Sequence, residues 1–138
     1  MRPPEEVLRD LVRDWVGKAD LDYRAAERLL QDQERLREII AFHCQQAAEK
    51  YLKGFLVRHQ VEFPKTHNFR QLLNLVSRVS PEMAASLKDA AELGPYGVDV
   101  RYPGDFHVLP GQEEKAFELA RRAKDTVMGR LEPYLSGR

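Results

Sequence analysis

The sequence predicts an all-α fold, an up-and-down antiparallel bundle of four main helices with a short fifth. Apolar residues recur every three or four positions over long stretches, which is the spacing of one buried helix face. The connections between these stretches are short, and short connections favour antiparallel neighbours. With 138 residues, the chain is expected to form a single domain over residues 1–138 that is large enough to bury a core.

The first helix is expected to begin at Pro3–Pro4, because proline and the acidic residues that follow favour the first turn of a helix. Its apolar positions run from Val7 to Leu30, and a polar joint at residues 31–33 ends the pattern. Gly17 lies in the middle of this helix and suggests a close helix crossing or a bend.

The second helix is expected from Glu34 to Arg58. Its apolar residues cover more than one narrow stripe, which suggests burial on two sides. At its centre, residues 42–53 read FHCQQAAEKYLK and mix small, aromatic, amide and charged residues. We expect this stretch, called the hub below, to organise the packing, with Gly54 at a tight contact.

The second half of the chain is predicted to hold two further helices, a loop and a last helix. Thr66 is the expected N-cap of the third helix, and Ser80, followed by proline, is the N-cap of a short fourth helix. The fourth helix is expected to end at residues 93–95, Leu-Gly-Pro. Glycines, prolines and aromatic residues predict a long functional loop over 96–111, and the last helix runs over 112–134.

Composition and charge limit the function classes. The 22 basic and 22 acidic residues cancel, which argues against a protein that coats nucleic acid regardless of sequence, because such binding needs a large basic surface. The single cysteine, Cys44, is expected to be a small buried apolar residue in a reducing compartment. No signal peptide or membrane span is visible. The sequence therefore predicts a cytoplasmic protein without a membrane partner.

The four histidines do not suggest a metal site. No two of them have zinc-ligand spacing on one helix face, and no phosphate-binding glycine loop is present, so neither a metal nor another cofactor is expected. His43 is interpreted as a hydrogen-bonded helix residue. His67, at the expected start of a helix, is interpreted as a neutral residue that caps or packs.

The glycine-rich loop carries the pair with the clearest chemistry, Arg101 and His107. An arginine fork suits phosphate, and a histidine can act as a general acid or base. Together they are the minimum needed to cleave RNA without a metal, since the arginine can stabilise the charge that builds up on phosphorus. The alternative is structural, with Arg101 anchoring the loop to an acidic residue and His107 lying at the surface.

The chain resembles the HEPN family, the "higher eukaryotes and prokaryotes nucleotide-binding" domain. The residues that carry the resemblance are Trp15, Ala19, the segment 23–26, the hub with Gly54, the segment 64–69 (PKTHNF) and the segment 101–103 (RYP). The resemblance implies a helical bundle that forms a homodimer and is often encoded beside a minimal nucleotidyltransferase, as a toxin–antitoxin-like pair. Many members are metal-independent ribonucleases that use an arginine and, a few residues later, a histidine, which is the arrangement of Arg101 and His107.

Two functions from different classes are therefore expected. The first is a binding and assembly module that dimerises, partners a nucleotidyltransferase and binds a nucleotide or RNA. The residues expected to bind in this case are Gln46, Lys50, Lys53 and Tyr102, beside Arg101. The second is a ribonuclease toxin in which Arg101 and His107 of each subunit meet across the dimer interface. Ribonuclease members of the family usually have a small polar residue directly after the arginine, where this chain has Tyr102. Some members have a tyrosine two residues after the histidine that the partner adenylylates, where this chain has Leu109. Both differences favour the first function.

Overall fold

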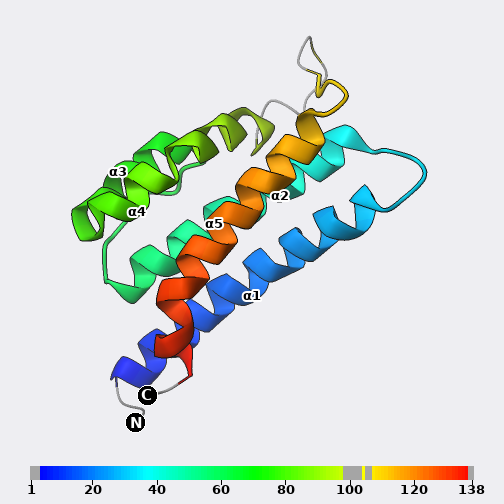
Figure 1. Cartoon of the computed structure of the whole chain (residues 1–138). Helices are drawn as coiled ribbons and strands as arrows, with labels where there is room; N and C mark the ends of the chain where they lie inside the picture. Colours follow the sequence, from blue (N-terminus) through cyan, green and yellow to red (C-terminus); the bar gives the residue numbers. More distant parts are fainter. Residues whose placement is uncertain (1–3, 98–103, 105–106, 137–138) are drawn as a thin grey trace.

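The computed structural model of the chain describes residues 4–97, 104 and 107–136, and these residues form six helices (Figure 1). The helices are α1 (Pro4–Leu30), α2 (Arg37–Arg58), α3 (Phe69–Val79), α4 (Pro81–Ser86), the 3-10 helix η1 (Lys88–Gly97) and α5 (Gln112–Leu135). The described part of the chain contains no strand. The predicted all-α fold class is therefore confirmed.

Helix α2 lies at the centre of the bundle. It packs against α1, α5, α3 and η1. Helices α1 and α2 run antiparallel, and α5 runs in the same direction as α2 (Figure 1). The chain returns from the end of α2 to the start of α5 through α3, α4 and η1, which form a layer of short helices beside the three long ones.

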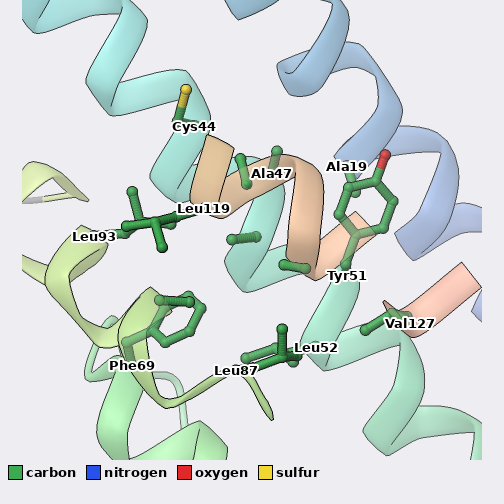
Figure 2. Packing of buried hydrophobic residues seen from close by; sticks show 14 of the residues in the cluster. Ala19, Cys44, Ala47, Tyr51, Leu52, Phe69, Leu87, Leu93, Leu119 and Val127 are labelled. Carbon is green, nitrogen blue, oxygen red and sulfur yellow. The ribbon is translucent and has the colours of Figure 1, made fainter. Parts of the chain in front are cut away.

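The hub is the centre of the hydrophobic core, as the sequence predicted. Figure 2 shows apolar side chains of α2 enclosed by those of every neighbouring element. The fully or almost fully buried residues around this point are Ala19, Cys44, Ala47, Tyr51, Leu52, Phe69, Leu87, Leu93, Leu119 and Val127. Each fully buried leucine or phenylalanine side chain contributes about 1.5–3 kcal/mol relative to an exposed one, so burial on several sides makes α2 the main source of stability.

Two glycines were expected at close contacts, and one of them is. A Cβ atom added at Gly54 would lie 3.3 Å from Cβ of Trp15, so α1 and α2 approach closely there. A Cβ atom added at Gly17 would meet nothing within 4 Å. The predicted close crossing at Gly17 is therefore wrong, because this residue lies on the open side of α1.

The start of α3 differs from the prediction by two residues. The N-cap is Asn68, whose side chain accepts a hydrogen bond from the backbone N–H of Gln71 at 3.1 Å. The hydroxyl of Thr66 instead accepts one from the backbone N–H of Asn68 at 2.9 Å, outside the helix. The predicted cap at Ser80 is confirmed, since its side chain accepts from the backbone N–H of Met83 at 3.2 Å.

Other boundaries move by a few residues. Helix α2 begins at Arg37 rather than at Glu34. The fourth helix ends at Ser86, and the chain continues as the 3-10 helix η1 to Gly97, so the expected loop begins later than predicted. Most of that loop, residues 98–103 and 105–106, lies outside the described residues. None of the helices within the described ranges is long and apolar enough to cross a lipid bilayer.

Cys44 is a buried residue of α2 with a free thiol. Burial raises the pKa of this thiol from 9.0 to about 12. The thiol therefore stays protonated and unreactive at neutral pH, which confirms the expectation of a small buried apolar side chain.

Candidate functional site

A buried carboxylate, Glu49, lies in the middle of α2 with 2% of the residue exposed. Its Oε1 accepts a hydrogen bond from Nε2 of Gln45 at 2.9 Å and faces Nδ1 of His67 at 3.1 Å. Its Oε2 accepts from Nζ of Lys53 at 3.0 Å. Buried charges are tolerated when they are paired and hydrogen-bonded, and Glu49 meets both conditions.

Helical spacing explains three members of this cluster. Gln45, Glu49 and Lys53 are four residues apart, so they share one face of α2. The side chain of Gln46 extends the cluster, because its Nε2 donates to Oε1 of Gln45 at 2.6 Å. We call Gln45, Gln46, Glu49, Lys53 and His67 the Glu49 network.

The last residue of η1 packs directly on this network. A Cβ atom added at Gly97 would lie 2.6 Å from Cδ and Oε1 of the Gln45 amide. Such a distance is shorter than any real contact, so only glycine fits there without a shift of the amide or of the η1 backbone. The end of η1 is thereby fixed against the centre of α2.

The ammonium group of Lys53 is enclosed by aromatic rings. Its Nζ lies 5.7 Å from the ring centroid of Trp15 and 5.7 Å from that of Phe63. These distances are within the range of cation–π attraction. Since the side chain is 10% exposed, the ion pair with Glu49 is largely shielded from water.

A second cluster, again with a carboxylate, a lysine and a histidine, joins α1 to α2. Oδ1 of Asp22 lies 2.8 Å from Nδ1 of His43, and Oδ2 accepts from Nζ of Lys50 at 2.5 Å. Burial raises the pKa of Asp22, but the hydrogen bonds from His43 and Lys50 outweigh burial and hold this pKa below its usual 3.8. We call these three residues the Asp22 cluster. The expectation that His43 is a hydrogen-bonded helix residue is confirmed.

Comparison with known protein families identifies the family to which the chain belongs. The model of the HEPN domain matches residues 12–129, which include the hub and both polar clusters. The chain belongs to the HEPN family. No curated protein and no solved structure gives a match. Membership of the HEPN family confirms the resemblance seen in the sequence and supports a nucleotide- or RNA-related function.

In this HEPN domain the predicted binding stripe of α2 is divided between the two clusters. Gln46 and Lys53 belong to the Glu49 network, whereas Lys50 pairs with Asp22. Each of these side chains already has a polar partner within the chain. Their contact with a nucleotide or RNA stays a prediction.

Of the predicted catalytic pair in the loop, Arg101 and His107, the structure describes only His107. Arg101 and Tyr102 lie outside the described residues. His107 is exposed and is followed by the buried Val108, which anchors this part of the chain to the core. The catalytic pairing of Arg101 with His107 therefore stays a prediction.

Three residues of the polar clusters, Asp22, Gln45 and Glu49, were not foreseen from the sequence, and His67 was assigned differently. His67 neither caps nor packs at the start of α3, because Asn68 provides the cap and the imidazole binds Glu49. The four-residue spacing between Gln45 and Glu49 was a usable signal for the network. No spacing links Asp22 to α2, since only the fold brings that contact together. Among the described residues, no group of three or more histidine, cysteine, aspartate or glutamate side chains is arranged to hold a metal ion.

Proposed function

We propose that this HEPN domain is a homodimeric binding module for a nucleotide or RNA, and that it partners a minimal nucleotidyltransferase in a toxin–antitoxin-like pair in the cytoplasm. The family match over most of the chain carries the proposal. The hub supports it, because Gln46 and Lys50 are only partly buried and both lie on α2, where the neighbouring Gln45 contacts Gly97 of η1. Tyr102 and Arg101 follow η1 in the sequence within a few residues.

Exposed apolar side chains support the homodimer. Leu21 is 66% exposed and Ile39 is 47% exposed. Leu21 precedes Asp22 of the Asp22 cluster, and Ile39 lies one helical turn before His43, so both flank the same contact between α1 and α2. A second copy of the chain would cover this apolar surface.

The homodimer is tested by light scattering of the purified full chain. A dimer at tens of micromolar protein is expected, and Leu21→Glu should shift it towards the monomer. Arg78→Glu, at an exposed position of α3 rather than of α1 or α2, is a charge-altering control. A monomeric parent chain at this concentration would contradict the proposed dimer.

The binding function is tested by titration of the full chain with ATP and, separately, with a short single-stranded RNA. A saturable signal is expected for at least one of them, and Lys50→Ala and Tyr102→Ala should weaken it. Absence of binding to both at millimolar ATP and micromolar RNA would contradict the binding function. The partner is tested by co-expression with a minimal nucleotidyltransferase encoded beside this chain, where co-purification is expected.

A second function, metal-independent cleavage of RNA, is favoured by the exposure of His107. Its imidazole is accessible to a substrate next to the anchored Val108. The purified chain would then cleave single-stranded RNA in the presence of a chelator, and Arg101→Ala or His107→Ala would abolish cleavage. Cleavage that persists in both variants would exclude these residues as the catalytic pair.

A further inference from the structure

The imidazole of His67 contacts Glu49 on one side and is exposed to solvent on the other. Its Nδ1 faces the carboxylate of Glu49 at 3.1 Å. A carboxylate only accepts hydrogen bonds, so Nδ1 is the nitrogen that carries the proton in this contact. The other ring nitrogen, Nε2, therefore lies on the side away from α2, and the side chain is 50% exposed there.

The partner of His67 is held rigidly in the core. Glu49 has 3% of its side chain exposed and is fixed by Gln45 and Lys53 as well as by His67. The charge of Lys53 balances that of Glu49 within the network. A positioned carboxylate behind an imidazole fixes the orientation of the ring, and here it leaves Nε2 facing the surface.

A depression of about 280 Å³ lies where His67 reaches the surface. It is lined by His67, Asn68, Phe69 and Arg70 at the start of α3 and by Ala91, Gly94 and Pro95 of η1. The ionisable side chains of this lining, Arg70 and His67, are both basic. The side chain of Asn68 already caps α3. Among the residues that the structure describes, the lining of the depression therefore presents two basic side chains and no acidic one.

We propose that His67 and Arg70 form a binding site for one phosphate group of a nucleotide or RNA, in the depression between the start of α3 and η1. The proposal rests on the nucleotide- or RNA-binding function given above and names its contact. An arginine fork and a histidine Nε2–H donate charge-assisted hydrogen bonds to phosphate oxygens. The volume of about 280 Å³ is slightly below the range of ligand sites, roughly 300–1,000 Å³, which suits one phosphate and its sugar rather than a whole dinucleotide.

The site is tested by the affinity of the full chain for a short single-stranded oligoribonucleotide and for ATP. Arg70→Ala and His67→Ala are each expected to raise the Kd about tenfold, because each removes one charge-assisted hydrogen bond. Arg78→Ala is the matched control, since Arg78 is an exposed arginine near the other end of α3. It should leave the Kd within twofold of the parent value.

The outcomes separate the two proposals. If the parent chain binds neither ATP nor RNA, the binding function falls and this site falls with it. If the parent binds but Arg70→Ala and His67→Ala bind equally well, the site is wrong and the binding function stands. Competition by ATP for bound RNA would show that both phosphate sources use this depression, and loss of only one ligand in the variants would assign the site to that source.

Discussion

The two polar clusters each contain a carboxylate, a lysine and a histidine, but they have different structural roles. In the Asp22 cluster the carboxylate comes from α1, and its two partners, His43 and Lys50, come from α2. In the Glu49 network the carboxylate and the lysine are both on α2, and the histidine comes from the connection that precedes α3. The first arrangement ties two helices together, whereas the second holds one surface side chain.

Burial sharpens the difference. The side chain of Asp22 is 13% exposed and that of His43 is 28% exposed. The side chain of Glu49 is 3% exposed, yet its histidine is 50% exposed. A carboxylate buried this deeply is costly unless it is paired, so the network that presents His67 is also the more fragile one. The following predictions test this contrast, in order of decreasing effect.

Glu49→Gln is expected to have the largest effect on stability. It leaves the buried ammonium of Lys53 without a counter-charge, and breaking a buried pair in this way costs about 3–5 kcal/mol. Chemical denaturation of the parent and variant measures this difference. Glu27→Gln, at an exposed position of α1, is the control and should change the free energy of unfolding by less than about 0.5 kcal/mol. A decrease of less than about 1 kcal/mol in the free energy of unfolding of Glu49→Gln would show that the Glu49–Lys53 ion pair is less shielded from water than the structure indicates.

Asp22→Asn should cost less, about 1–3 kcal/mol, because an amide retains one acceptor oxygen for His43 or Lys50. The same denaturation experiment applies, with Asp14→Asn at an exposed position of α1 as the control. A loss equal to that of Glu49→Gln would remove the distinction between the two clusters.

Acid should weaken the α1–α2 contact through Asp22. Its pKa is held below the usual 3.8 in the folded chain. A carboxyl with a depressed pKa contributes stability that is present above its usual pKa and is lost as the pH falls through the folded value. The pKa of Glu113 is also held below its usual value. Burial raises this pKa, but hydrogen bonds from the backbone N–H groups of Glu113 and Gly111 and from the side chain of Arg35 lower it by more. Denaturation midpoints should therefore fall as the pH decreases below about 4, and less steeply in Asp22→Asn. An unchanged slope in the variant would contradict this role of Asp22.

The two histidines should show the smallest changes in stability. His43→Ala is expected to cost about 1 kcal/mol, the value of an ordinary hydrogen bond, whereas His67→Ala should cost about half as much because water can replace a half-exposed imidazole. Thermal and chemical unfolding of both variants measure this. A larger loss for His67→Ala would mean that His67 serves mainly to fasten the connection before α3.

Most of the fold could be predicted from the sequence because its helices are amphipathic and long. Periodic apolar residues located α1, α2 and α5, and the pair Ser80–Pro81 located the start of α4. Thr66 and Asn68 are both good N-cap residues, and composition cannot choose between them. Most of the 3-10 helix η1 was predicted as the second half of the fourth helix. Its last residues were missed because Gly94 and Pro95 suggested that the helix ended there, whereas the chain continues in a tighter turn to Gly97.

The polar clusters were less predictable for a different reason. Glutamate and lysine four residues apart on a helix usually form an exposed pair, so Glu49 and Lys53 gave no sign of burial. Their burial follows from α3, η1 and the connection 59–68 covering that face of α2, which is a property of the tertiary fold. The contact between Asp22 and His43 likewise depends on the register of α1 against α2. Local sequence patterns contain neither piece of information.

The burial of Cys44 gives the chain a natural reporter of local opening. This single cysteine has 0% of its surface exposed. A thiol reagent must reach the sulfur atom and reacts with the thiolate. In the folded hub the sulfur is buried and the thiol stays protonated, so labelling is blocked. In an opened chain the pKa of the thiol returns from about 12 to its ordinary value of 9.0. The rate of thiol labelling at mildly alkaline pH therefore measures how often the packing around α2 opens. The rate can be compared between the parent chain and each variant without introducing a probe.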